Sequence, residues 1–484
     1  MNDKTEFLNI GDLPETLLVL GNGFDLTCKV PSDYKKFLEY ILEQKLNFYS
    51  DELQKYGFSN IFEYTLSEIE RYLKDTNFAN DKAIRKSGVV PELNSWYIIF
   101  LYRKLTNDTD WFQVENQIAS QLTANDNSMN IVESIGDSLL SIYQNGKYMR
   151  RSQRISYLNN KEIEKIYELL SYNLLKKQIG PFKDKGYKDL FIEFRKKVKE
   201  LWKEYYELWI EYFEYNGRNI GSRIDREKFE DTFESKLEKE LFPMVAQVLL
   251  AELKELEMDF REYLTSSISH MGYTYEENAG NLIESILKKI GKDTENSTYN
   301  VLTFNYTTPW DMYEKRNLGE DPHPIFKGNP IKTLNLHGRL DSWTQEIIFG
   351  VDDEFLSPLS NEYIFTKTSR TLDLYTKGMF EEWLNSSMSE ILSPSIKEIV
   401  FFGHSLSKAD YGYFRKILDN YVDNPEAHFI FVYNVYKGTT SDKKRRELIQ
   451  SISSLFGEYS INKQSNTDIF RDLIQNNRIK IVEL

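Results

Sequence analysis

The sequence predicts an α/β protein, with a doubly wound, mainly parallel β-sheet that is interrupted by a large, all-helical insertion. Three observations support this prediction. A short apolar run near the beginning leads into glycines and a helical pattern, the middle of the chain is helical in character, and short apolar runs then alternate with helical segments. We expect the first β–α unit of the sheet domain at residues 1–49, the helical insertion at 50–295 and the remainder of the sheet domain at 296–484.

The first strand is expected at residues 16–20, because a continuous apolar run of this length is typical of a strand that is buried on both faces. After the glycines, residues 31–46 repeat apolar side chains at helical spacing, and Ser32 or Asp33 can cap the start of that helix. These two segments predict a β–loop–α unit.

The insertion is expected to be mostly helical. Residues 194–215 contain neither glycine nor proline, and residues 242–268 have a single proline near their start. The many aromatic residues of this region are interpreted as helix–helix packing.

Beyond residue 298 the chain contains short apolar segments that we expect to be strands. Helical patterns at 411–422 and 443–456 lie between some of them, and this alternation is typical of a parallel sheet. The expected strands are at 299–307, 332–338, 346–351, 397–405, 426–434 and 478–484.

Composition argues against several classes of protein. The chain has 61 Lys and Arg against 75 Asp and Glu, a net charge of −14, so we do not expect it to bind nucleic acid. A single cysteine, Cys28, allows no intrachain disulfide and no cysteine-rich zinc site, as is typical of cytoplasmic proteins. Because neither a signal-peptide pattern nor an apolar run of about 18 residues is visible, we expect a cytoplasmic protein without membrane association.

Four polar clusters directly follow predicted strands. Ligands of open parallel sheets bind beyond the carboxyl ends of the strands, so we expect all four clusters to face one crevice. The clusters are Gly21-Asn22-Gly23-Phe24-Asp25, Asn305-Tyr306-Thr307, His337-Gly338 and Gly403-His404-Ser405.

The first cluster has two interpretations. Glycines between a strand and a helix let the backbone approach a phosphate, but Leu26 occupies the third glycine position of the dinucleotide-binding fingerprint, so a purely structural turn is the alternative. Because Asp25 would repel a phosphate, we expect its carboxylate to accept hydrogen bonds from ribose hydroxyls or from the loop backbone.

The remaining clusters carry groups suited to catalysis. His337 ends a predicted strand, and an imidazole transfers protons near neutral pH. Asn305 can hold a ribose hydroxyl or an attacking water, although an Asn-led turn is the alternative. Ser405 and Ser407 can cap the helix that follows, and the helix dipole favours Asp410 in its first turn, but these structural roles account less well for His404.

Six spaced motifs together resemble the AbiH family of bacterial abortive-infection, anti-phage proteins. More distantly, the order of the motifs resembles the Rossmann-like, NAD-binding fold of the sirtuins. The motifs are LLVLGNGFDL, the Trp111 and Glu115 pair of WFQVENQI, LTFNYTTPWD, LNLHGRL, IIFGVDDE and FFGHSLSKAD.

The resemblance implies roles for these residues. The turn from Gly21 to Asp25 would hold the phosphates and ribose of NAD, and Asn305 and His337 would break the nicotinamide–ribose bond. Sirtuin deacylases hold a structural zinc with four cysteines, so deacylation is not expected here, nor is a metal. The other implied NAD-binding residues are Tyr306, Gly403, His404, Ser405, Asp410, Trp111 and Glu115.

Three functions follow as hypotheses. The first is an effector that hydrolyses NAD after a phage protein triggers it, with self-association expected by analogy. The second is a sensor that binds a nucleotide without turnover. The third is a nuclease, in which a divalent metal would be held by Asp25, Glu115, Asp352 and Asp353. Trp111 and Glu115 lie four residues apart, on one face if this segment is a helix, where they would cap the crevice or pack in the core.

Overall fold

The structure is a computed structural model of the 484-residue chain. Compact packing divides the chain into a sheet unit (residues 1–37, 260–348 and 370–484) and a helical unit (residues 38–259 and 349–369). The structure describes residues 13–46, 57–74, 93–106, 113–123, 130–143, 161–176, 185–215, 235–294, 297–310, 329–341, 346–352, 356–379, 386–436, 438–464 and 468–484.

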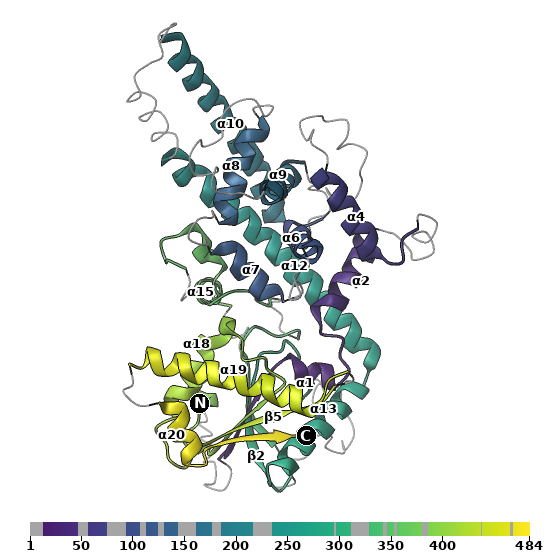
Figure 1. Cartoon of the computed structure of the whole chain (residues 1–484), viewed down its shortest axis with the longest axis vertical. Coiled ribbons are helices and arrows are strands. Elements are labelled where there is room, and N and C mark those ends of the chain that lie inside the picture. Colours follow the sequence, from purple (N-terminus) through teal and green to yellow (C-terminus); the bar gives the residue numbers. More distant parts are fainter. Residues whose placement is uncertain are drawn as a thin grey trace, which may run out of the picture. The chain divides into compact units, whose positions relative to one another are not determined.

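The sheet unit contains a six-stranded sheet in which every neighbouring pair is parallel. The strand order is β3-β2-β1-β4-β5-β6, so the order reverses between β1 and β4. Figure 1 labels β2 and β5, the strands that flank these two in the sheet. This arrangement confirms the predicted α/β class and the parallel sheet. The strands are β1 (Thr16–Leu20), β2 (Thr298–Thr303), β3 (Asn329–Asn335), β4 (Glu398–Phe402), β5 (His428–Tyr433) and β6 (Ile479–Glu483).

Burial along the strands explains the continuous apolar runs of the sequence. All five residues of β1 are buried, because β2 and β4 flank this strand and side chains cover both of its faces. Edge strand β6, in contrast, has only half-buried and exposed residues.

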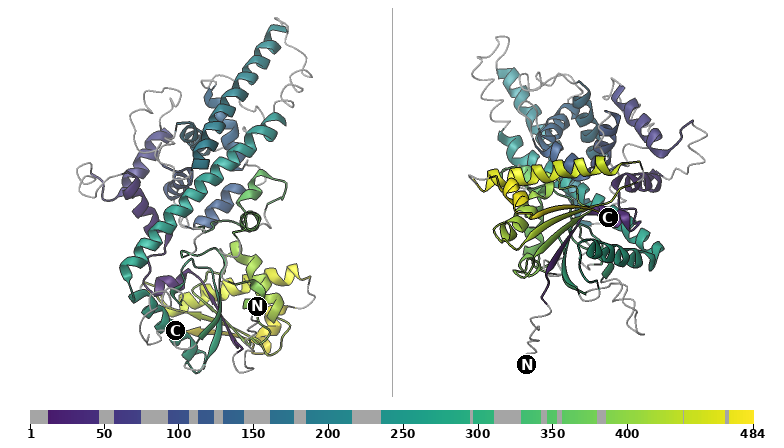
Figure 2. Two further views of the ribbon diagram at one scale, coloured as in Figure 1. Left: turned by 180° about the vertical axis from the view of Figure 1, so that it is seen from behind. Right: turned by 60° about the horizontal axis from the view of Figure 1, so that its bottom comes forward.

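Helices cover both faces of the sheet. In Figure 2, α19, in yellow, lies along one face and α13, in dark teal, along the other. One core cluster joins Val19 and Phe401 of the sheet to Phe414 and Phe456 of the covering helices. The helices that lie wholly in this unit are α1 (Asn22–Thr27), α13 (Thr274–Lys289), α17 (Met388–Ile391), the 3-10 turn η7 (Lys408–Asp410), α18 (Tyr411–Tyr421), α19 (Ser441–Asn462) and α20 (Ile469–Gln475).

The segment 346–351, expected as a strand, forms only isolated bridges, from Ile347 to Gly338 and from Val351 to Thr366. Its apolar side chains are nevertheless buried. A short apolar run indicates burial but does not by itself distinguish a ladder strand from another buried segment, which explains the error.

The helical unit contains long amphipathic and buried helices. Trp96 and Tyr97 are fully buried, and the Trp96 indole donates to the carbonyl of Leu249, so these aromatic residues pack between helices as expected. Within the described part of the chain, no helix combines the length and apolar character needed to cross a membrane. The helices are α4 (Ile61–Lys74), α6 (Ser95–Leu105), α7 (Val114–Leu122), α8 (Ile131–Tyr143), α9 (Lys161–Lys176), α10 (Lys185–Tyr215), the π-helical turn η4 (Leu237–Leu241) and the 3-10 helix η6 (Asn361–Phe365). The helices α2 (Tyr34–Leu46), α12 (Phe242–Met271) and α15 (Lys367–Thr376) have residues in both units.

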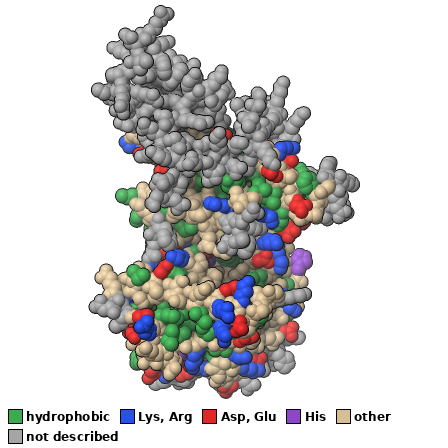
Figure 3. Space-filling model, viewed as in Figure 1, with side chains coloured by type: hydrophobic (Ala, Val, Ile, Leu, Met, Phe, Trp, Pro, Cys, Tyr) green, Lys and Arg blue, Asp and Glu red, His purple; other side chains and the backbone are tan. Residues whose placement is uncertain are grey.

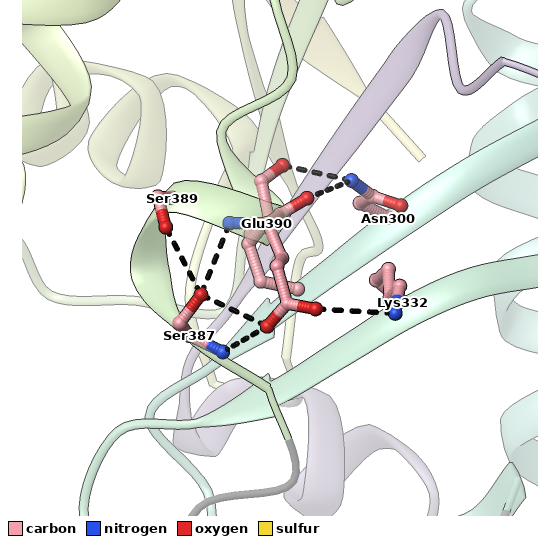
Figure 4. A network of polar contacts seen from close by, with 6 residues as sticks. Asn300, Lys332, Ser387, Ser389 and Glu390 are labelled. Carbon is pink, nitrogen blue, oxygen red and sulfur yellow. Dashed lines mark hydrogen bonds and ion pairs between the residues drawn. The ribbon is translucent and has the colours of Figure 1, made fainter.

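A polar network fixes α17 beside β2 and β3 (Figure 4). Ser387 and Glu390 form a reciprocal capping box, Lys332 of β3 pairs with the Glu390 carboxylate at 3.3 Å, and Asn300 of β2 donates to the carbonyl of Ile391. Hydrogen bonds from the Ser387 backbone and side chain, together with Lys332, lower the pKa of Glu390 to about 2.

Candidate functional site

The turn after β1 packs directly on the turn after β4. The Gly21 N–H donates to the Phe402 carbonyl at 3.0 Å, and the Gly23 N–H donates to the Gly403 carbonyl at 2.7 Å. A Cβ at Gly21 would lie 2.6 Å from the His404 Cα, closer than side-chain carbons approach a backbone. The two glycines therefore allow the backbones of the two turns to come close together. Their contact with a phosphate stays a prediction.

Gly403 also requires glycine for its own conformation. Its φ of +72° is in the left-handed region, and a Cβ there would lie 2.5 Å from the Phe24 nitrogen. Phe24 is itself buried, whereas Asn22 is exposed and exchanges hydrogen bonds with Ser32.

Asp25 is buried and joins three segments of the sheet unit. Its carboxylate accepts hydrogen bonds from the Tyr275 hydroxyl on α13 and from the Thr307 hydroxyl after β2, each at 2.9 Å. Burial raises the pKa of Asp25 to about 7, although both hydrogen bonds lower it. Burial also raises the pKa of the neighbouring Cys28 thiol, and the Asp25 charge adds to this effect.

Asn305 connects the carboxyl ends of three strands. Its Nδ2 donates to the carbonyl of Gly21 at 3.1 Å, and the Asn335 side chain donates to the carbonyls of Asn305 at 2.9 Å and Thr307 at 3.0 Å. Asn335 is a residue that sequence reasoning missed. Its position at the end of β3, two residues before His337, is the signal that could have identified it.

Two predicted histidines converge on the buried carboxylate of a third predicted residue, Asp410. Asp410 Oδ1 lies 3.4 Å from His337 Nε2, and Asp410 Oδ2 lies 3.3 Å from His404 Nε2. The three side chains are 5% to 6% exposed. The His337 contact lacks hydrogen-bond geometry, so Nε2 of His337 is a buried nitrogen that faces a carboxylate without a formed hydrogen bond.

Aromatic rings surround these groups. The Phe304 ring centroid lies 4.3 Å from that of His404 and 5.6 Å from that of His337. Tyr413 packs on His337 and Phe414 on His404, at centroid distances of 5.7 and 4.9 Å. These rings limit the access of water to the imidazoles, which strengthens their interaction with the carboxylate.

Asp410 does not act as a helix cap. It occupies the N-cap position of α18, but its side chain accepts no capping hydrogen bond from the backbone of that helix. Ser407 caps η7 as expected, by accepting the N–H of Ala409, while Ser405 is exposed. The carboxylate of Asp410 faces the two histidines instead.

A family model described as "Bacteriophage abortive infection AbiH" matches residues 17–194 and 184–433. The two ranges together cover most of the chain. The chain belongs to the AbiH family. This confirms the resemblance to AbiH, and the membership indicates a role in abortive infection by bacteriophage. No curated protein and no solved structure is significantly similar to the chain.

The AbiH match contains the whole candidate site. It begins within β1 and ends at the last residue of β5, so it includes Asp25, Asn305, His337 and Asp410. The helix α19 and the edge strand β6 lie beyond it.

The motif residue Glu115 belongs to the helical unit, where it pairs with the buried Lys367 at 3.0 Å. Asp352 is buried in the same unit, and Trp111 and Asp353 lie outside the described residues. Among the residues that the structure describes, no group of three His, Cys, Asp or Glu has the arrangement of a metal site.

The surface charge of this AbiH protein is mixed on the face shown in Figure 3. Lys and Arg side chains are interspersed with Asp and Glu over the described surface of that face. A nucleic-acid interface usually gathers its cations in one patch or stripe.

Proposed function

We propose that this protein is an effector of abortive infection that hydrolyses the bond between nicotinamide and ribose in NAD after a phage trigger. The observation that carries the proposal is the contact between His337 and the buried Asp410 at the carboxyl edge of the sheet. An imidazole that faces a buried carboxylate is suited to accept a proton from water.

The strand order supports a dinucleotide as the ligand. Doubly wound sheets with the order 3-2-1-4-5-6 bind dinucleotides where the order reverses, and here that point lies between β1 and β4. The turns that contain Gly21 and Gly403 follow these two strands. On this basis we infer a Rossmann-like, sirtuin-like fold.

The proposed reaction uses His337 as the general base. If the 3.4 Å contact with Asp410 Oδ1 closes into a hydrogen bond, it places the proton of His337 on Nε2 and leaves Nδ1 to accept a proton. Nicotinamide departs with the electrons of the bond to ribose, water adds to the ribose carbon, and His337 takes the proton of that water. The products are nicotinamide, ADP-ribose and a proton. Asn305, which holds the Gly21 carbonyl, would keep the turn after β1 in place.

The experiment measures nicotinamide release from NAD by protein that is purified from phage-infected cells. We expect His337→Gln to lower the rate by about 10²–10⁴-fold, the usual contribution of a general base. The matched control is His270→Gln, because His270 is an exposed histidine on α12. Absence of release by the triggered wild-type protein would contradict the proposed reaction, and an unchanged rate in His337→Gln would contradict the role of His337.

A nucleotide sensor without turnover is the second candidate. The strand order supports this candidate as well, because it favours a dinucleotide at the reversal between β1 and β4 and does not require that the dinucleotide is cleaved. Calorimetry with NAD and with ADP-ribose separates the candidates. Tight binding of NAD that remains intact after prolonged incubation would favour the sensor.

A further inference from the structure

Leu406 has an unusual backbone conformation for a buried leucine. Its φ is +56°, in the left-handed region that side chains other than glycine rarely adopt. The side chain is 4% exposed and belongs to the same core cluster as Phe414. Such strain persists where surrounding packing imposes it, and it is concentrated at functional sites.

The strained residue directs its N–H at a ring nitrogen. The Leu406 N–H donates to His404 Nδ1 at 2.8 Å. A nitrogen that accepts a hydrogen bond carries no proton, so the proton of the neutral ring is on Nε2. Nε2 is the atom that lies 3.3 Å from Asp410 Oδ2.

We propose that Leu406 and His404 form a positioning device that orients the Asp410 carboxylate toward His337, an inference that rests on the proposed role of His337 in proton transfer. Leu406 fixes the tautomer of His404, and His404 offers its Nε2 proton to Oδ2 of Asp410. Oδ1 is then held toward His337. His404 and Leu406 act through Asp410 and do not need to touch the substrate.

The Nε2-protonated tautomer of His404 also argues against a metal site formed by His337, His404 and Asp410. Two imidazoles and one carboxylate are a common ligand set for transition metals. A histidine that ligates a metal through one nitrogen normally donates a hydrogen bond from the other. His404 instead accepts at Nδ1, so its Nε2 is protonated and cannot ligate a metal while the Leu406 contact is present.

The first test reads the tautomer directly in the full-length wild-type protein. The chain has five histidines, so selective ¹⁵N-histidine labelling gives few signals, and the His404→Gln spectrum assigns those of His404. We expect an unprotonated Nδ1 and a protonated Nε2 for His404. A protonated Nδ1 on a neutral His404, or metal that co-purifies in stoichiometric amount, would overturn the proposal.

The second test compares conservative and disruptive substitutions. His404→Gln retains an N–H donor near the position of Nε2, and His404→Leu removes it. Leu406→Gly accepts a positive φ and retains the N–H, whereas Leu406→Val, with its branched Cβ, disfavours that conformation. Groups that orient a functional residue typically contribute 10–100-fold, so we expect His404→Leu and Leu406→Val to lower kcat for NAD by about 10–100-fold with KM little changed. The Gln and Gly variants should lose less of kcat than the Leu and Val variants at the same positions.

The controls are His428→Gln and His428→Leu, because His428 lies at the start of β5, the end of the strand opposite the site. Melting temperatures identify variants that fail to fold. Equal losses in His404→Gln and His404→Leu would overturn the proposal.

If the triggered wild type releases no nicotinamide, the proposed function fails, but the phage plating efficiency on cells that carry the same variants still tests the positioning device. Protection that is kept by Gln and lost by Leu supports it, and equal protection in both contradicts it.

Discussion

At the scale of single residues, the buried Asp25 has the clearest consequence for pH dependence. Its carboxylate is held by Tyr275 and Thr307, and its pKa is raised from 3.8 to about 7 mainly by burial. Between these values the unfolded chain has released the proton that the folded chain retains. The contribution of Asp25 to stability is therefore complete below its unfolded pKa and is lost as the pH rises through about 7.

We predict that Asp25→Asn reduces this dependence. Asparagine retains an oxygen for Tyr275 and an amide that can donate to Thr307, but it carries no titrating proton. The measurement is the melting temperature at pH 5 and pH 8 for both proteins, with Tyr275→Phe as a variant that keeps the carboxylate. A drop between the two pH values that is equal in wild type and Asp25→Asn would show that Asp25 is not its source.

Gly403 supports a second prediction at the residue scale, because it combines a positive φ with a close approach to Phe24. The control is Gly438→Ala, since Gly438 has a φ of +94° but open space around it. Left-handed strain alone costs about 1–2 kcal/mol. We expect Gly403→Ala to lower the free energy of unfolding by clearly more than Gly438→Ala. Urea denaturation measures the free energy of unfolding of both variants. Equal losses in Gly403→Ala and Gly438→Ala would mean that the turns after β1 and β4 can move apart without cost.

At the scale of elements, α17 illustrates how a four-residue helix is held in place. The capping box of Ser387 and Glu390 satisfies backbone donors, and Lys332 joins the helix to β3 (Figure 4). These contacts favour the ionised carboxylate, so the folded pKa of Glu390, about 2, lies below its ordinary value of 4.5. The contribution to stability is present above pH 4.5 and is lost as the pH falls toward 2.

We therefore predict that Glu390→Gln loses less stability than the wild type between pH 5 and pH 3. The urea midpoint at the two pH values is the measurement. Glu426→Gln is the matched control, because Glu426 makes a surface ion pair with Lys397 but belongs to no capping box. The carboxylate of Glu390 is largely exposed, so solvent screens its contacts and the difference will be modest. Parallel behaviour of Glu390→Gln and wild type would contradict the prediction.

At the scale of the whole molecule, the central strand comes from a segment far from its partners in sequence. Leu18 of β1 aligns with Val301 of β2 and Val400 of β4. The sheet therefore forms by pairing strands that are far apart in the sequence, and such non-local pairing slows folding. Because β1 is buried throughout, its packing contributes to both halves of the sheet.

We predict that Val19→Ala destabilises the protein by about 2–3 kcal/mol, the lost transfer free energy of two buried carbons plus a cavity. The matched substitution Val482→Ala, on the half-buried edge strand β6, should cost less than about 1 kcal/mol because less of its surface leaves water on folding. Urea denaturation compares the two variants. Equal losses would mean that β6 is as well packed as β1.

Part of the fold and of the site was predictable from residues alone. The run at 16–20 predicted β1, and the motifs at strand ends placed His337, His404 and Asn305 at the carboxyl edge. The hydrogen bond from Tyr275 to Asp25 was not predictable, because Tyr275 comes from α13 about 250 residues later. The same holds for Asp410, whose place in the first turn of a helix was accounted for by the helix dipole and whose carboxylate faces two histidines.

The sequence by itself determined the α/β class, the parallel sheet and the AbiH membership, because continuous apolar runs, their alternation with helices and the motif order are local properties of the chain. Only the tertiary structure decided the strand order, the contact of Gly23 with Gly403 and the meeting of His337, Asp410 and His404. These features depend on which distant segments pair and how closely their backbones approach, and that is settled by packing over the whole sheet.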